Sequence, residues 1–169
     1  MNSDRITARF GSYGVELLEQ SRRHRVANLH SGTVPEHICR TLAVTVFHLP
    51  VHDALRQVDE AIRAGASLGA TLRSSGWRVI RSDAAQATAP AGSAFERLSQ
   101  QSCPVGTPLA LQVYTLLAAS DAQRLPYAAI AEAYHPDHVA IANPLSAQAL
   151  ESELSGAAKE ALQGLLAAL

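Results

Sequence analysis

Leu109-Ala-Leu-Gln-Val-Tyr-Thr-Leu-Leu-Ala-Ala119 and Leu125-Pro-Tyr-Ala-Ala-Ile-Ala-Glu-Ala-Tyr134 are the two apolar runs that decide the fold of this chain. As strands they form a hairpin around residues 120–124. As helices each run carries one apolar stripe, and Pro126 suits a first helical turn. Alanine-rich composition favours helices, whereas a sheet formed by the preceding residues needs its edge covered, which favours the hairpin. We predict the hairpin.

The residues before this region indicate a sheet. Ile6, Ala8 and Phe10 alternate with polar residues or glycine, as in a half-buried strand. The run 41–47 is apolar on both faces and rich in β-branched residues, which is typical of a central strand. Further strands are predicted at 15–19, 25–30 and 77–81.

Two helices are predicted to pack on this sheet. Between about 51 and 75, apolar residues and two glycines recur every three or four positions, which predicts one long helix with Gly65 and Gly69 on its buried stripe. Between about 146 and 168, Ser146 is a candidate N-cap ahead of a leucine and alanine stripe. The predicted fold class is therefore α+β, with a largely antiparallel sheet.

We expect the 169 residues to form a single α+β domain. Residues 83–107 lack clear periodicity and are predicted to form a low-complexity loop within it. The N-terminus has no apolar signal region and no run is long enough to span a bilayer, so we expect a soluble cytoplasmic protein. Cys39 and Cys103 lack metal-binding or redox spacing and are expected to be free, buried thiols.

Charged residues make up only 17% of the chain, and the net charge is −1. A surface with so few charges is covered either by small polar residues or by a partner. The apolar C-terminal helix could supply an interface for a homo-oligomer, or it could cover the domain's own sheet. The near-neutral charge gives no general attraction to nucleic acid or to a membrane surface.

Four of the seven histidines form the candidate metal site: His48, His52, His135 and His138. Imidazole nitrogens bind divalent metals, and three ligands with an open water position would suit hydrolysis. The hypothesis requires the two pairs to meet in space. The alternative is that these are scattered surface and loop histidines, because their spacing matches no specific metal motif.

Two other sequence patterns are typical of enzymes. His135 and Asp137 could act as an acid-base pair in which the carboxylate orients the imidazole, although His-Pro-Asp-His also reads as a simple turn. Gly65-Ala-Ser-Leu-Gly69 matches the G-x-S-x-G string of serine hydrolases. That motif needs a strand before it, and a helix is predicted here, so Ser67 is expected to face solvent.

Read as helices, residues 125–150 superficially look like a helix-turn-helix. The segment that would enter the DNA groove, 137–150, contains no lysine or arginine and includes Pro144, which argues against DNA binding.

No motif in the sequence is specific enough to assign a function. The favoured hypothesis is a non-enzymatic domain that binds a small molecule or a protein partner and self-associates. The alternative is a small metal-assisted or His/Asp acid-base enzyme, and the sequence identifies neither a cofactor nor a ligand.

Overall fold

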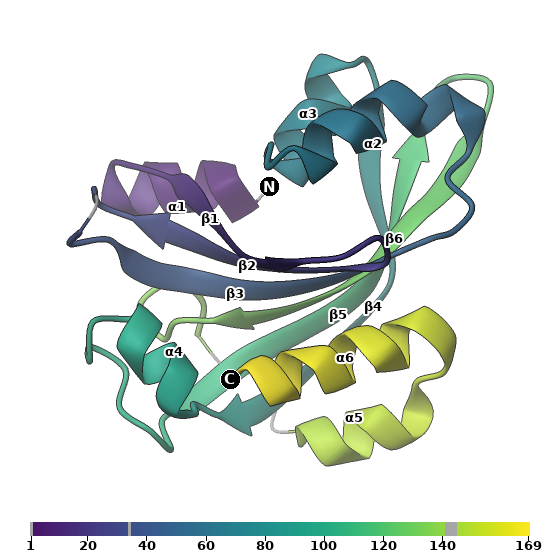
Figure 1. Cartoon of the computed structure of the whole chain (residues 1–169). Helices are drawn as coiled ribbons and strands as arrows, with labels where there is room; N and C mark the ends of the chain where they lie inside the picture. Colours follow the sequence, from purple (N-terminus) through teal and green to yellow (C-terminus); the bar gives the residue numbers. More distant parts are fainter. Residues whose placement is uncertain (1, 34, 141–144) are drawn as a thin grey trace.

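A twisted antiparallel sheet forms the centre of the protein (Figure 1). The computed structural model describes residues 2–33, 35–140 and 145–169, and in this part of the chain six strands pair in the order β1-β2-β3-β6-β5-β4. All five pairings are antiparallel, so the predicted α+β class with a largely antiparallel sheet is confirmed. The strands are β1 (Gly14–Gln20), β2 (His24–Ser31), β3 (Ile38–Phe47), β4 (Arg78–Pro90), β5 (Pro108–Ala119) and β6 (Arg124–Tyr134).

The two apolar runs form the predicted hairpin, as β5 and β6. Both strands are apolar on both faces because helices cover both sides of the sheet. Leu111 and Val113 of β5 point into one core, whereas Tyr114 and Leu116 point into the other. Since residues 125–134 are a strand, the first helix of the considered helix-turn-helix does not exist.

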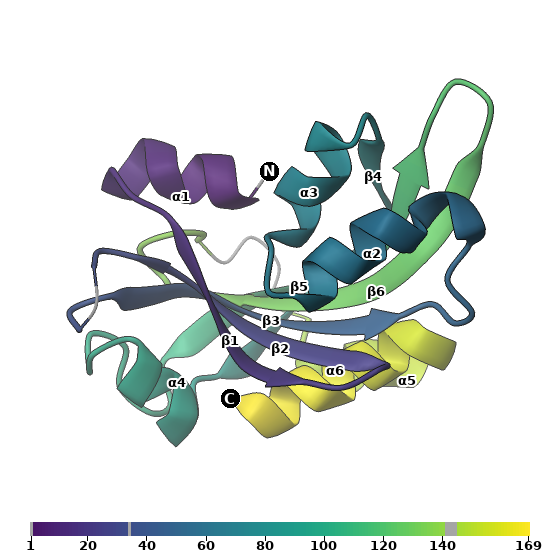
Figure 2. The same cartoon turned by 45° about the horizontal axis from the view of Figure 1, so that its top comes forward.

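Helices cover the sheet on both faces (Figures 1 and 2). On one face lie α1 (Asn2–Phe10), α2 (Arg56–Arg63) and α3 (Leu68–Ser74), and on the other lie α4 (Ser93–Leu98), α5 (Ala147–Glu153) and α6 (Gly156–Ala168). The apolar stripe of α6 packs on β3, β5 and β6. This helix approaches closely: a Cβ atom added at Gly164 would lie 3.0 Å from Val44 Cγ1. The stripe therefore covers the sheet of its own chain.

Both predicted helices are interrupted. The segment 51–75 contains a short 3-10 turn (Asp53–Leu55), then α2 and α3, with a break between Arg63 and Leu68. Gly65 adopts φ +105° in this break, and a Cβ atom there would meet nothing within 4 Å. Its role is thus to turn the chain after α2, which corrects its predicted position on the buried stripe of one long helix. The segment 146–168 is likewise divided into α5 and α6.

The predicted N-cap of the C-terminal segment is confirmed, since Ser146 Oγ accepts a hydrogen bond from the Ala149 backbone N–H at 3.2 Å. Cys39 and Cys103 are free and buried, as predicted.

The predicted strand at residues 6–10 is wrong, because these residues belong to helix α1. Ile6 is fully buried, together with Asn2 one turn earlier. Asn2, Ile6 and Phe10 are spaced four residues apart, as on one face of a helix. The strand prediction relied on the alternation of only three residues, Ile6, Ala8 and Phe10.

The predicted loop over 83–107 is also wrong in large part. Residues up to Pro90 continue β4 past an irregularity at Asp83, which has φ +52°, and Ser93–Leu98 form α4. Ala87 and Ala89 alternate with polar neighbours and point into the core. Buried and more exposed residues alternate with a period of two in this segment. Because the buried positions hold small alanines, the sequence resembles a low-complexity loop. Pro90 is tolerated because β4 lies at the sheet edge.

In the described residues, no helix combines the length and apolarity needed to cross a membrane.

The positive φ angle at Gly65 gives a test of the break between α2 and α3. Gly65→Ala should lower the free energy of unfolding by about 1–2 kcal/mol, because an L-residue at this φ is strained even though space is available. Urea denaturation measures the change. Gly65→Asn should lose less, since asparagine tolerates positive φ better. An unchanged stability in Gly65→Ala would contradict the described turn.

Candidate functional site

A cavity lies between the sheet and the helical layer formed by α1, α2 and α3. It offers about 70 Å³ to water, which is room for several water molecules. Its walls come from all six strands, from the start of α1 and from the turn that begins α3. The polar side chains that line it are Asn2, Ser3, Tyr13, Arg25, Thr45, Ser67, Arg81, Tyr114 and Glu132.

Arg25 brings a buried cation to this cavity from β2, with only 3% of its surface exposed. Its Nη1 donates to the carbonyl oxygens of Ile62 (3.1 Å) and Ala66 (3.0 Å), at the carboxyl end of α2. Burial lowers the pKa of Arg25, but a guanidinium remains protonated in proteins. In the described part of the chain its Nε and Nη2 groups have no protein acceptor, so they remain available to a ligand.

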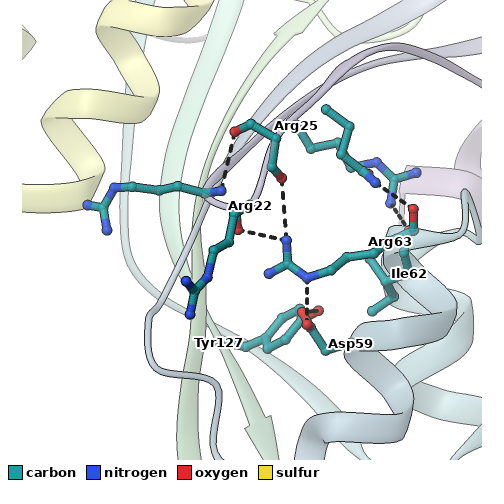
Figure 3. Close-up of polar contacts among 9 residues, drawn as sticks. Arg22, Arg25, Asp59, Ile62, Arg63 and Tyr127 are labelled. Carbon is teal, nitrogen blue, oxygen red and sulfur yellow. Dashed lines mark hydrogen bonds and ion pairs between the residues drawn. The ribbon is translucent and has the colours of Figure 1, made fainter.

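The position of α2 above the sheet depends on a second group of polar contacts, drawn in Figure 3. Asp59 accepts from Arg63 Nε at 2.6 Å and from the Tyr127 hydroxyl at 2.8 Å. Arg63 Nη1 also donates to the Arg22 carbonyl at 2.7 Å, which connects α2 to the β1–β2 turn. These contacts hold the end of α2 where Arg25 can reach it.

Glu132 supplies the single carboxylate in the described lining of the cavity. It lies on β6 and is 4% exposed. Its oxygens accept from the Asn2 side-chain amide at 3.1 Å and from the Tyr134 hydroxyl at 2.6 Å, and Arg81 Nη2 lies 3.6 Å away. Burial, followed by the charge of Glu132, raises the pKa of Tyr134, so its hydroxyl remains a donor. The carboxylate is therefore held by the protein's own groups.

Arg81 is the second cation of the cavity, and its guanidinium stacks on the Tyr114 ring at 4.3 Å from the ring centre. Burial, the largest influence, lowers its pKa, but the nearby Glu132 carboxylate and tyrosines outweigh it and the pKa is raised overall. The cavity thus carries two cations and one carboxylate. Tyr13 and Tyr114 stay neutral, because burial raises the pKa of both.

Ser67 lies in the turn before α3 and lines the cavity, with its Oγ 3.3 Å from the Tyr13 hydroxyl. This corrects the expectation that Ser67 faces solvent, which assumed an unbroken helix. The serine is still not an activated nucleophile. No histidine belongs to the described lining of this cavity, and the preceding element is a helix.

The structure separates the two predicted histidine pairs. The His48 backbone N–H bonds to the Tyr127 carbonyl near one end of β6, whereas His135 directly follows Tyr134 at the other end. Seven residues of strand separate these points by about 24 Å. In residues 2–33, 35–140 and 145–169, no group of three or more His, Cys, Asp or Glu side chains could hold a metal ion. His48, His52, His135 and His138 therefore do not form one shared site here.

His135 lies beside both Asp137 and Ser102, but the hydrogen bonds oppose acid-base activation. Its Nδ1 accepts from the Asp137 backbone N–H at 3.1 Å, which leaves the proton of the neutral ring on Nε2. Nε2 then donates to Ser102 Oγ at 3.1 Å, while the serine hydroxyl donates to the Ser99 carbonyl. A nucleophilic serine would need the opposite direction, donating to Nε2. Burial lowers the pKa of His135, which is 2% exposed.

His138 has a structural role in this network. Its Nε2 donates to the Asn2 side-chain oxygen at 2.6 Å, and the Asn2 amide in turn binds Glu132. The ring is 5% exposed and its Nδ1 has no partner, so a proton there would be buried without compensation. Burial, followed by the nearby arginines Arg5, Arg9 and Arg40, lowers the pKa of His138 to about 4.

Comparison with known structures identifies the fold. The ligand-binding domain of a Bordetella bronchiseptica protein assigned to the GntR family of transcriptional regulators is similar, with a TM-score of 0.51 and 15% identity over 79% of this chain and 92% of that one. The C-terminal domain of PhnF gives a TM-score of 0.49 and 15% identity, over 75% and 85% of the two chains. A GntR-family regulator from Enterococcus faecalis gives 0.43 and 12%, over 78% and 95%.

No protein-family model and no curated protein sequence matches the chain. The structural likeness, at this low identity, shows a shared α+β fold.

Sequence reasoning missed the three charged residues of the cavity. Each nevertheless carried a signal, because Arg25, Arg81 and Glu132 adjoin or interrupt apolar runs that form strands. A charged side chain in a buried strand is costly unless it is paired or used, so such residues are candidates for a site. Their convergence from β2, β4 and β6 could not be read locally, since it depends on the strand order.

The lowered pKa of His138 predicts that acid weakens folding. The unfolded chain takes up a proton near pH 6.5 and the folded protein only near pH 4. The stability contributed by neutral His138 is thus complete above pH 6.5 and is lost as the pH falls to about 4, by up to ~3 kcal/mol. Urea denaturation at pH 7.5, 5.5 and 4.5 measures this loss.

The matched variants are His138→Gln and His48→Gln, since His48 is exposed. His138→Gln should reduce the slope of unfolding free energy against pH, and His48→Gln should retain it. Equal slopes in the two variants would show that His138 is not the group responsible. Some slope should remain in His138→Gln, because burial also lowers the pKa of His30 and His135.

Proposed function

We propose that this chain is a non-enzymatic binding domain whose ligand is a compact organic anion held in the cavity between the sheet and helices α1–α3. The observation that carries the proposal is Arg25: a buried guanidinium that faces a cavity and has N–H groups without a protein acceptor. Burying a guanidinium whose N–H groups lack acceptors costs free energy, unless a ligand supplies the acceptors.

The composition of the cavity supports an anion. Two guanidinium groups outnumber one carboxylate, and that carboxylate already accepts hydrogen bonds from Asn2 and Tyr134. Arginine pairs with carboxylate and phosphate through parallel hydrogen bonds, which add both energy and orientation. The Tyr13 and Ser67 hydroxyls offer further hydrogen bonds to the polar groups of a ligand, and Leu29, Leu68 and Leu116 offer apolar contact.

The absence of an activated pair among the described lining residues supports binding over catalysis. No histidine lies beside Ser67 in the described lining. In the His135–Ser102 pair, His135 Nε2 donates to the serine oxygen, so the histidine does not act as a base toward the serine hydroxyl. The fold is compatible with this role, since the similar Bordetella bronchiseptica structure is itself named a ligand-binding domain. A fold alone does not assign a function, whereas the side chains of the cavity favour a particular kind of ligand.

A thermal-shift screen of small carboxylates and phosphate esters tests the proposal, because a compound that binds only the folded state raises Tm. For any compound that binds, Arg81→Gln should weaken affinity by about 10-fold or more in isothermal titration calorimetry, since it removes a charge-assisted hydrogen bond. Arg78→Gln is the matched control. It changes the same strand, but Arg78 is exposed, pairs with Asp121 and lies outside the cavity lining.

Two results would contradict the proposal: no anion in the screen raises Tm, or Arg81→Gln and Arg78→Gln weaken binding equally.

Self-association and a cytoplasmic location stay predictions. The apolar face of α6, which suggested an oligomer interface, packs on β3, β5 and β6 and so no longer supports one.

A further inference from the structure

A second cavity lies on the other side of Arg81. It is larger than the first, at about 200 Å³, and is bordered by α1, β4, β5, the end of β6 and the residues just beyond it. Its polar lining consists of Arg5, Arg81, Gln86, Gln112 and Tyr134. Among the described residues, Arg81 is the one that lines both cavities, so the two cavities adjoin at this side chain.

The hydrogen bonds of Gln112 determine which of its groups is available to a ligand. Its side-chain oxygen accepts from Arg81 Nη1 at 3.1 Å and shares the Tyr134 hydroxyl hydrogen, at 3.0 Å, with Glu132. A carbonyl oxygen has two acceptor positions, and both are directed at these donors. The amide NH₂ of Gln112 is the group left over, and it can only donate.

The positive charge of this cavity is only partly compensated, because Arg81 pairs with Glu132 at 3.6 Å whereas Arg5 has no such partner among the described residues. Arg5 is exposed on α1 and forms no ion pair within the described residues. No carboxylate belongs to the described lining, and Glu132, the acid closest to Arg81, is held by Asn2 and Tyr134. Two guanidinium groups and an amide NH₂ therefore line a cavity whose described walls contain no carboxylate.

We propose that this second cavity, here named the outer cavity, is an anion-binding site for a carboxylate or phosphate group held between Arg5 and Arg81, with Gln112 donating a further hydrogen bond. Guanidinium and amide donors match the oxygens of both anions. The site shares Arg81 with the cavity of the proposed function, but Arg5 and Gln112 line the outer cavity alone, so variants of Arg5 test it separately.

An NMR titration of the ¹⁵N-labelled full chain tests the inference, with inorganic phosphate and acetate as separate probes at constant ionic strength. Saturable shifts are expected at the Gln86 and Gln112 amides. Phosphate binding more tightly would assign the site to phosphate groups, and acetate binding more tightly would assign it to carboxylates.

Arg5→Gln should weaken the binding of the preferred probe at least about fivefold, because it removes a charge-assisted contact. Arg9→Gln is the matched control. It removes the same charge from the same helix, but Arg9 lies beside Phe10 and outside the cavity lining. Its effect on affinity should be less than twofold.

Three outcomes would overturn the inference. Shifts that do not saturate with either probe would show that there is no site. Equal weakening in Arg5→Gln and Arg9→Gln would show general charge attraction. Shifts centred on Ser67 and Leu68 would place the anion in the first cavity, which would refute the outer site while supporting the proposed function.

Discussion

The ion pair and hydrogen bonds around Glu132 join the parts of this structure that define both cavities. The carboxylate lies in a strand that is covered on both faces, where a charge is tolerated only if donors surround it. Those donors come from three places: Asn2 at the start of α1, Tyr134 on the same strand, and Arg81 on β4. One buried charge thus fixes the N-terminal helix over the sheet and pairs with Arg81, which lines both cavities.

At the opposite end of the helical layer, buried polar groups are likewise paired by residues of neighbouring elements. Asp59 is buried on α2 and accepts hydrogen bonds from Arg63 and Tyr127, and two carbonyl oxygens at the end of α2 accept from Arg25. Both cavities lie beside guanidinium groups that the described protein does not fully pair with acceptors. Arg25 keeps unused N–H groups, and Arg5 has no acidic partner in the described chain. The binding proposals are two consequences of this surplus of donors.

Local sequence was a sound guide to long apolar strands and a poor one where side chains were small or segments short. The central strand around residues 41–47 was predicted because it is apolar on both faces and rich in β-branched residues, and the hairpin of residues 109–134 because the sheet needed its edge covered. Residues 83–90 were missed because alanine fills the inward positions of β4. The helix at residues 2–10 was missed because two turns of helix and three residues of alternation give similar patterns.

The α+β class and the cap at Ser146 followed from sequence, since periodicity and capping depend on neighbours along the chain, and the β5–β6 hairpin followed from the need to cover a sheet edge. The site did not. His48 and His135 looked like partners but lie at opposite ends of β6, whereas Arg25, Arg81 and Glu132 come together across the order β1-β2-β3-β6-β5-β4. That order depends on which edges and faces are best buried together. Only the folded sheet could therefore decide which charges share a cavity.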